Sequence, residues 1–354
     1  KKGNTEGLVI SVYLIFQIAL DFVEKINVNL NLGVPPLHRY IKAVFILYIS
    51  INVLIEIKNF YKNYLFIYVA VLLCVFMFSR NYSEQRIEYL MQYGYFFMVS
   101  LFYLKHKINS LCLKRIIKTM IITNFVVIMV GIIFNESIFL TYNHTRFGYN
   151  GFILSQMQTT VFYLSSLAFC LYSKDKPLFL ITFISSMLAG TKALLLGIPI
   201  LIILFFIFDK RNKQILYFGI LTTLISFFGL IELFKTNIFK EILENEGYFT
   251  MFFSYRDKLF LSTFNNLQED YSIFNFLIGG FDLSVYKTEF DFVDITLFFG
   301  VIGLIMLILI FNYLYNYYCI SSPAKAYFIT IILVAFFAGN IIAYPVNSFL
   351  FLTI

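Results

Sequence analysis

Five charged residues in this chain have types and positions suited to phosphate and proton chemistry. Arg146 lies in Thr-Arg-Phe-Gly-Tyr-Asn-Gly-Phe, Lys192 in Ala-Gly-Thr-Lys-Ala and Arg256 in Phe-Ser-Tyr-Arg-Asp-Lys, while Asp291 and Asp294 share Phe-Asp-Phe-Val-Asp-Ile. Cations hold the negative charge of a leaving diphosphate, and the planar guanidinium of arginine does so best. A nearby carboxylate orients or deprotonates an acceptor hydroxyl. The set predicts a site for a diphosphate-linked substrate.

Each of these residues also has a simpler interpretation. Arg146 and Lys192 fit basic residues that reach from helix ends to lipid headgroups. Arg256 could pair with its neighbouring aspartate or another acidic residue, and Asp291 could cap the start of a helix. Asp294 lies one turn further in, on the same helix face as Asp291, so capping explains it less well. The choice depends on where the surrounding elements place these side chains.

Those elements are membrane helices, as the composition indicates. The 354 residues are 60% hydrophobic and 13% charged, and the mean hydropathy is +0.81. Soluble domains have about 25% charged residues, and a globule of this size needs a charged surface. Continuous apolar runs of about 20 residues match the helix length that a bilayer requires. Strands of a membrane barrel would alternate instead.

We predict an all-α, polytopic transmembrane bundle of about 11 to 12 spans, with residues 1–354 forming a single transmembrane domain. The predicted spans lie near 8–23, 41–57, 64–79, 88–104, 116–134, 151–172, 178–190, 193–208, 215–233, 292–312 and 326–344, and a twelfth begins near 346. The pair 178–190 and 193–208 fits either a tight hairpin or one longer broken helix. The first apolar run is interpreted as a membrane helix and not as a removed signal peptide.

The distribution of Lys and Arg predicts the orientation. With the N-terminus in the cytoplasm, the inner segments hold 15 of the 27 basic residues and only 4 of the 20 acidic ones, a net charge of +11, and the outer side has −4. The positive charge is therefore a topology signal and requires no nucleic-acid partner. In this orientation all five candidate site residues fall on the outer side.

Residues 234–290 form a long outer connection that we predict to be a functional extracytoplasmic loop. Its apolar and aromatic residues argue against disorder, and residues 255–268 fit a short helix lying along the membrane surface. The other notable outer loop is 135–150. Cys74, Cys112, Cys170 and Cys319 are widely spaced, so neither a disulfide framework nor a zinc site is favoured. The three histidines are too scattered for a metal site.

Four short motifs around the long loop carry a family resemblance. They are Ala-Gly-Thr-Lys-Ala-Leu-Leu-Leu-Gly (189–197), Ser-Tyr-Arg-Asp (254–257), Asp-Phe-Val-Asp-Ile-Thr-Leu-Phe-Phe-Gly-Val-Ile-Gly-Leu (291–304) and Phe-Ala-Gly-Asn (337–340). Their order and spacing over residues 140–344 resemble the Wzy-type repeat-unit polymerases of O-antigen and capsule, in the O-antigen ligase/polymerase superfamily. The individual motifs are short and apolar, so the resemblance depends on their arrangement.

The resemblance implies a GT-C-like helical fold in the bacterial cytoplasmic (inner) membrane and a glycosyltransferase activity. Such proteins move a growing glycan from undecaprenyl diphosphate onto a new lipid-linked repeat unit, without a metal, nucleotide sugar or other cofactor. By motif match, diphosphate binding is assigned to Arg256, and also to Arg146 and Lys192. A chain-length regulator protein is a further partner that the family analogy allows.

The same resemblance leaves the general base open between Asp294 and Asp291. The ligase branch has a His-Asn pair at the loop exit and a later His after a Gly, whereas this chain has the two aspartates and Asn340 in those places. That difference favours a polymerase over a ligase. A transporter or flippase for the lipid-linked sugar is the alternative from another class. Such proteins have charges inside a central cavity and short loops, whereas few charges here fall within the predicted spans.

Overall fold

The computed structural model describes residues 2–55, 63–79, 83–105, 110–142, 147–209, 213–270, 272–342, 344, 347, 348 and 350. Within these ranges the regular structure is helical, and the one β-type pairing is an isolated bridge between Leu140 and Tyr149. The predicted all-helical class is confirmed.

The helices follow one another with short connections. They are α1 (Lys2–Leu30), α2 (Leu37–Ile55), α4 (Tyr64–Phe78), α5 (Glu84–Lys105), α6 (Ser110–Phe134), the 3₁₀ turn η1 (Ser137–Phe139), α7 (Gln156–Ser173), α8 (Lys176–Leu188), α9 (Lys192–Phe208), α10 (Lys213–Phe234), α11 (Asn237–Phe253), α12 (Arg256–Asp270), α13 (Ile273–Ile278), α14 (Asp291–Tyr318) and α15 (Ser322–Ala338).

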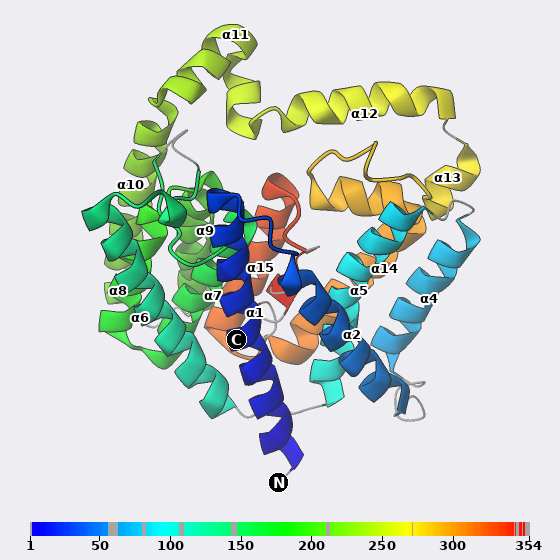
Figure 1. Ribbon diagram of the computed structural model, residues 1–354, viewed down its shortest axis with the longest axis horizontal. Coiled ribbons are helices and arrows are strands. Elements are labelled where there is room, and N and C mark those ends of the chain that lie inside the picture. The colour runs from blue at the N-terminus through cyan, green and yellow to red at the C-terminus, as the bar shows by residue number, and fades with distance from the viewer. Residues whose placement is uncertain are drawn as a thin grey trace.

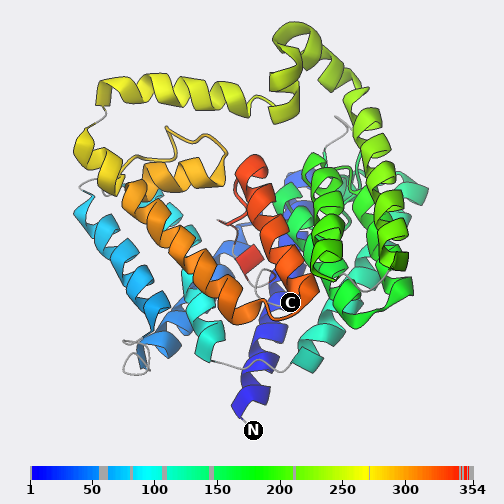
Figure 2. The same cartoon turned by 180° about the vertical axis from the view of Figure 1, so that it is seen from behind.

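Most of these helices run up and down between two ends of the molecule. The N-terminus lies at one end, and α11, α12 and α13 lie at the other (Figures 1 and 2). We call the end that carries α12 the α12 end. Thr141 Oγ1 donates to Ala189 O (2.9 Å) there, while Ser322 Oγ donates to Phe208 O (3.4 Å) at the opposite end. Lys118, near the start of α6, donates to Asp175 at the start of α8 (3.1 Å). The start of α6 lies at the end opposite α12 (Figure 1), so α8 runs toward the α12 end and α9 runs back from it, as the hairpin alternative predicts.

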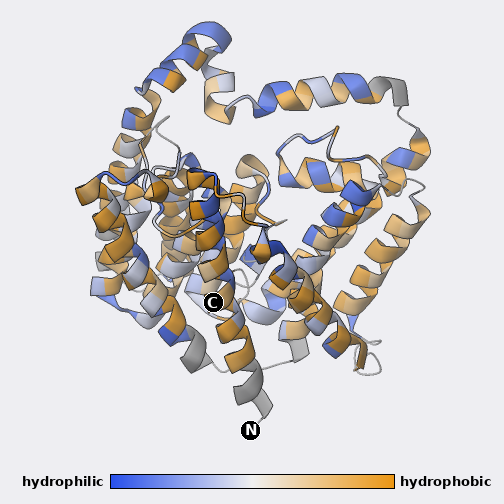
Figure 3. Cartoon of the chain, in the orientation of Figure 1, coloured by the Kyte–Doolittle hydropathy of each residue, from blue (hydrophilic) through white to orange (hydrophobic). Residues whose placement is uncertain are grey.

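The bundle carries large apolar side chains outside and polar side chains inside. Val44 and Phe228 are 66% and 64% exposed, whereas Asn124, Gln158 and Thr182 are buried. Orange, apolar positions accordingly cover much of the outward surface of the helices in Figure 3. This pattern is the reverse of the one that water selects, because a buried polar group costs free energy unless it is hydrogen-bonded.

By length and composition, three helices of the described chain could each cross a membrane. They are Leu37–Ile55, Lys114–Phe134 and Asp291–Tyr318, and the pair Gly219–Phe234 and Asn237–Phe253, bent by 73°, would make a fourth. Other apolar helices, such as α4, α8, α9 and α15, have 13 to 17 residues. The structure thus meets the length criterion for fewer spans than the 11 to 12 predicted. The predicted twelfth, near 346, falls mostly outside the described residues.

Helix α14 is not the continuous span predicted for 292–312. Gly300 has φ 70° and ψ −174°, which interrupts the helix. The freed carbonyls of Leu297 and Phe298 accept hydrogen bonds from Phe281 N (3.3 Å) and Gly280 N (3.2 Å). Residues 291–299 consequently form a short arm that lies across the bundle beneath α12, and the helix turns down only after Gly300 (Figures 1 and 2).

One further predicted boundary changes. The span predicted to start at 151 starts at Gln156, because buried side chains supply partners to the non-helical backbone before it. Asn124 Oδ1 accepts from Phe152 N (3.0 Å), and Lys25 Nζ donates to Gly151 O (2.8 Å).

The long connection 234–290 is largely helical, and its predicted surface helix 255–268 is present as α12.

Candidate functional site

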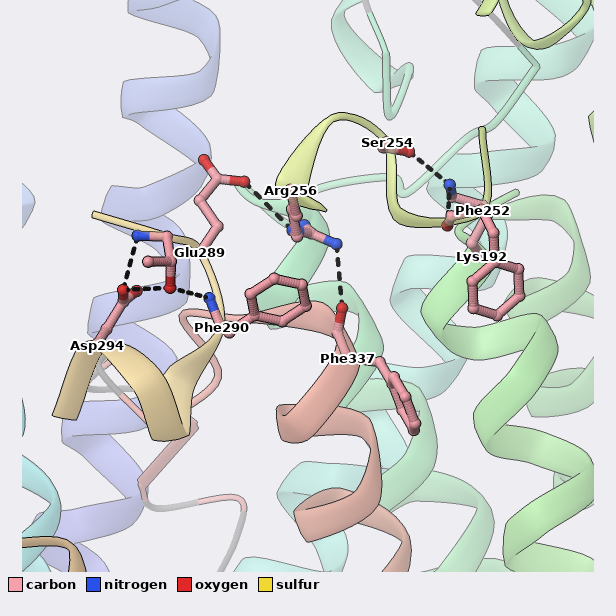
Figure 4. A network of polar contacts seen from close by, with 9 residues as sticks. Lys192, Phe252, Ser254, Arg256, Glu289, Phe290, Asp294 and Phe337 are labelled. Carbon is pink, nitrogen blue, oxygen red and sulfur yellow. Dashed lines mark hydrogen bonds and ion pairs between the residues drawn. The ribbon is translucent and has the colours of Figure 1, made fainter. Parts of the chain in front are cut away.

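Arg256 is the first residue of α12 and follows a tight turn. Ser254 and Tyr255 both have left-handed backbones, with φ of 52° and 68°. The turn directs the guanidinium toward the start of α14 and the end of α15 (Figure 4). There Nε donates to Glu289 Oε2 at 3.3 Å, and Nη1 donates to the carbonyl of Phe337 at 3.3 Å.

The guanidinium of Arg256 has N–H groups that make no hydrogen bond to the described residues. It has five N–H groups, and among the described residues it contacts two acceptors through single bonds. Its side chain is 17% exposed. Arginine binds carboxylate and phosphate most strongly through two parallel bonds, and the contact with Glu289 uses one. An anion that reached Arg256 would therefore find unused donors.

Lys192 lies at the start of α9 and holds the end of α11. Its ammonium donates to the carbonyls of Met251 (3.2 Å) and Phe252 (2.9 Å) and to Ser254 Oγ (2.5 Å). A cation at a helix C-terminus is stabilised by the unpaired carbonyls there. Its ammonium also lies 4.6 Å from the ring centroid of Phe239. In this structure Lys192 fixes the turn that presents Arg256.

Asp294 lies one turn into α14 and holds the preceding loop. Its Oδ1 accepts from the backbone N–H of Thr288 (2.7 Å) and from the Thr288 hydroxyl (2.8 Å). The same hydroxyl accepts from Phe290 N at 3.3 Å. Asp294 and Thr288 are each 1% exposed. These bonds fix the backbone on both sides of Glu289.

Asp291 joins α14 to the end of α15. Its Oδ2 accepts from Ile341 N (2.7 Å) and Ile342 N (3.2 Å), and its Oδ1 has no hydrogen-bond partner among the described residues. The residue is 1% exposed. Asp291 is the first residue of α14, where a carboxylate is favoured, but the N-cap position belongs to Phe290, and the Asp291 carboxylate binds the backbone at the end of α15.

The loop before α14 is also fixed at its other end. Asp282 accepts from the hydroxyls of Ser83 (2.8 Å) and Ser284 (2.8 Å). Partial burial alone would raise the pKa of Asp282, but the hydrogen bonds from Ser284 and Ser83, with Arg86 nearby, hold that pKa below its usual range. The ionised carboxylate thus ties this loop to the residues that precede α5.

These contacts connect four of the five predicted site residues. Lys192 binds the 251–254 turn, and Arg256 follows that turn and contacts Glu289 and Phe337. Asp294 accepts a hydrogen bond from Thr288, the residue before Glu289. Asp291 accepts a hydrogen bond from Ile341 N, in the turn that follows Phe337. Arg146, the fifth predicted residue, lies outside the described residues.

Left-handed backbone is concentrated around Arg256. Of the non-glycine residues described with positive φ, Ser254, Tyr255, Glu289 and Asn340 belong to this network. Each such conformation is unfavourable for an L-residue and persists only where its surroundings impose it, as they do at many functional sites. Gly339, also at positive φ, is required here because an added Cβ would lie 1.8 Å from Glu289 O.

Phenylalanine rings surround the Arg256–Glu289 pair. Phe290 lies between Phe253 (5.8 Å between ring centroids) and Phe260 (6.4 Å), and Phe253 also contacts Phe337 (6.4 Å). The rings come from α11, α12, the residue before α14, and α15. The side chains of Arg256 and Glu289 are 17% and 41% exposed, so the pair beside these rings remains accessible to solvent.

Sequence analysis missed Glu289. The residue directly precedes Phe-Asp-Phe-Val-Asp, but the two aspartates alone were taken as candidates because they share a helix face. Of the two partners considered for Arg256, the structure shows another acidic residue, Glu289, and not Asp257, whose Oδ2 accepts from Thr250 Oγ1 (2.6 Å). The Arg256 partner lies 33 residues further along the chain, a separation that no local pattern indicates.

A second polar cluster, also missed, lies inside the bundle. Asp21 is 2% exposed and accepts from Gln17 Nε2 (2.8 Å), Gln158 Nε2 (3.0 Å) and Lys42 Nζ (3.2 Å). Asp21 and Gln158 line a small, otherwise apolar pocket that also includes Phe152. No group of three or more His, Cys, Asp or Glu residues that could hold a metal ion occurs in the described ranges.

Comparison of the chain with family models, curated proteins and solved structures gives no significant match.

Proposed function

We propose that this chain is a membrane-embedded glycosyltransferase that polymerises undecaprenyl-diphosphate-linked oligosaccharide repeat units on the outer face of the bacterial cytoplasmic membrane. The product would be an O-antigen or capsular polysaccharide. The proposal combines the Wzy-type motif order in the sequence with the geometry of the Arg256 site.

One observation carries the proposal. Arg256 keeps unused donors beside an exposed carboxylate, Glu289, at the aromatic junction of α11, α12, α14 and α15. Transfer from a lipid diphosphate requires a cation for the leaving diphosphate and a group that receives the acceptor's proton. The four motifs that resemble the polymerases supply Lys192, Arg256, Asp291 and the Phe337–Asn340 turn to this network. Motifs far apart in sequence thus contribute to one site.

The surface of the bundle supports a membrane setting. Exposed apolar side chains with buried, hydrogen-bonded polar ones suit a lipid environment. The basic residues at the starts of α6, α8 and α10 lie at the end opposite α12 (Figure 1). With that end in the cytoplasm, as the positive charge favours, the Arg256 site faces outward.

Glycan gel analysis of a deletion strain tests the proposal. We expect the ladder of long chains to collapse to a single repeat unit on its lipid or core, and the wild-type gene to restore the ladder. Long polymer that persists on the lipid carrier without reaching its final acceptor would identify a ligase instead. An unchanged ladder would refute both.

The pair of buried Asp21 and half-buried Lys42 supports a second candidate, a transporter of the same lipid-linked sugar. Ionisable residues inside a helical bundle at membrane depth mark transport pathways in many membrane proteins. Asp21 falls within the predicted span 8–23, so it weakens the argument that few charges lie in the spans. Accumulation of repeat units on the cytoplasmic face of the deletion strain would favour this candidate.

A further inference from the structure

Glu289 differs from the other carboxylates of the Arg256 site in its access to solvent. Its side chain is 41% exposed, whereas Asp291 and Asp294 are each 1% exposed. Asp294 Oδ1 accepts from the N–H and the hydroxyl of Thr288, and Asp291 Oδ2 accepts from two backbone N–H groups. Asp291 Oδ1 has no hydrogen-bond partner among the described residues, but it is buried. A group that takes a proton from a substrate must come within hydrogen-bond reach of it. Of these three carboxylates, Glu289 alone offers that reach.

The backbone at Glu289 is fixed in an unfavourable conformation. Its φ is 60°, and the Thr288 anchor on Asp294 holds the residue before it. On the other side its carbonyl lies against Gly339, where even one added carbon would not fit. Strain of this kind persists only where the surroundings impose it. The fold therefore imposes the direction in which the Glu289 side chain leaves the chain.

We infer that Glu289 is the general base of the transfer reaction. Before substrate binds, the Glu289 carboxylate is paired with Arg256, and a lipid diphosphate that binds the guanidinium breaks this pair. The inference rests on the proposed function. Arg256 contacts Glu289 through one bond, at Nε. A diphosphate bound through the remaining N–H groups carries more negative charge than a carboxylate and competes for the same cation. Substrate binding thereby releases the carboxylate at the moment it is needed.

The step balances as follows. The acceptor hydroxyl oxygen bonds to the anomeric carbon of the donor glycan, and the bond from that carbon to the diphosphate oxygen breaks. The electron pair of the broken bond remains on the diphosphate, which leaves as an anion held by Arg256. The hydroxyl proton moves to the Glu289 carboxylate. Asp294 acts as a positioning residue, through Thr288.

The first test measures binding of farnesyl diphosphate to the purified full chain in lipid nanodiscs. Glu289→Gln removes the competing charge, so we expect about two- to fivefold tighter binding, in line with the strength of exposed ion pairs. Arg256→Gln should weaken binding at least tenfold. The matched control is Glu246→Gln, because Glu246 pairs with Lys258 on the adjoining α11–α12 surface. It removes the same charge and should leave binding unchanged.

The second test places the same variants in the deletion strain. We expect Glu289→Gln to make no polymer, and Glu289→Asp, which keeps the charge but shortens the side chain, to make at least tenfold less than wild type. Polymer in Glu289→Gln, or full activity in Glu289→Asp, overturns the inference. Inactivity with weaker binding in Glu289→Gln also overturns it, because Glu289 would then serve only to position Arg256.

Failure of the proposed function has a different signature. In that case the deletion strain keeps its polymer and the wild-type chain shows no affinity for farnesyl diphosphate. Inorganic pyrophosphate, used as a second probe, separates recognition of the diphosphate from recognition of the isoprenoid chain. If Glu289→Gln does not accumulate in the membrane, Glu289→Asp carries the test through its polymer yield.

Discussion

At the residue scale, the Arg256 guanidinium links two segments that are distant in sequence. Nε contacts Glu289 in the loop before α14, and Nη1 contacts Phe337 at the end of α15. A lysine ammonium is a point charge and cannot reproduce a planar fork. We therefore predict that activity depends on the geometry of the Arg256 donors as well as on their charge.

We predict that Arg256→Ala abolishes polymer, and that Arg256→Lys restores only part of the wild-type amount. Losing one of the two hydrogen bonds of a bidentate phosphate contact costs roughly 1.5–3 kcal/mol, since a hydrogen bond to a charged group has this strength. Polymer length and amount on glycan gels measure the effect, with membrane insertion checked by immunoblotting. Wild-type chain lengths in the alanine variant would contradict the assignment, and complete rescue by lysine would show that charge alone suffices.

Substitutions of Asp294 distinguish a role in positioning the loop before α14 from a role as general base. Asp294→Asn keeps an oxygen that can accept from Thr288 N and Oγ1, so we expect a folded chain with measurable polymer. Asp294→Ala removes the acceptor of both the Thr288 N–H and the Thr288 hydroxyl and should destabilise the chain by about 1–3 kcal/mol. If Asp294 were the general base, the asparagine variant would make no polymer despite normal stability.

At the element scale, the break in α14 decides where both aspartates lie. A continuous helix would place residues 291–299 along the bundle, whereas the break at Gly300 turns them across it beneath α12. Gly279 and Gly300 approach so closely that an added Cβ on Gly279 would lie 2.5 Å from Gly300 N. Broken helices at membrane depth are tolerated where protein buries the backbone, as the loop at Gly280 does here.

We predict that Gly300→Ala lowers the melting temperature strongly. Its φ of +70° is unfavourable for alanine, and the new Cβ would lie 2.2 Å from Leu277 O. The expected cost is at least about 2 kcal/mol. Gly94→Ala is the matched control. Gly94 lies inside α5 with no atom within 4 Å of an added Cβ, so the change should be neutral or stabilising.

A thiol-reactive fluorophore suits this comparison in a background with Cys74 and Cys112 replaced by alanine, because Cys74 is exposed whereas Cys170 and Cys319 are buried and react on unfolding. The chain has no tryptophan. Equal melting temperatures for the two alanine variants would show that the break at Gly300 is not needed for the fold.

These elements show what local patterns can and cannot predict. Apolar runs predicted helices over most of the chain, and even the surface helix at 255–268, because hydrophobicity and helix formation are properties of neighbouring residues. The break at Gly300 depends on a loop that donates to its freed carbonyls, and the Glu289 partner depends on a distant turn. Residue types alone identified Lys192, Arg256 and the aspartates, but not the backbone contacts that each of them makes.

At the scale of the whole molecule, polarity is arranged in two directions. Across the bundle, apolar side chains face outward and polar ones inward. Along the bundle, the starts of α6, α8 and α10, which carry basic residues, lie at the end opposite α12, and the candidate site lies at the α12 end. The first arrangement suits lipid, and the second is the basis of the proposed orientation within it. In the proposed orientation the site faces outward.

The orientation makes a prediction that two matched serines can test. Ser262 in α12 and Ser173 at the end of α7 are both exposed, and each hydroxyl donates to the carbonyl three residues before it. In a background whose four native cysteines are replaced by alanine, we expect Ser262→Cys to react with a membrane-impermeant maleimide in spheroplasts. Ser173→Cys should react only after lysis.

The reverse result would invert the topology and place the Arg256 site in the cytoplasm, where repeat units are assembled but not polymerised in the proposed scheme. Labelling of both positions in intact spheroplasts would mean that the bundle does not separate its two ends by a membrane, and the proposed reaction would then lose its setting.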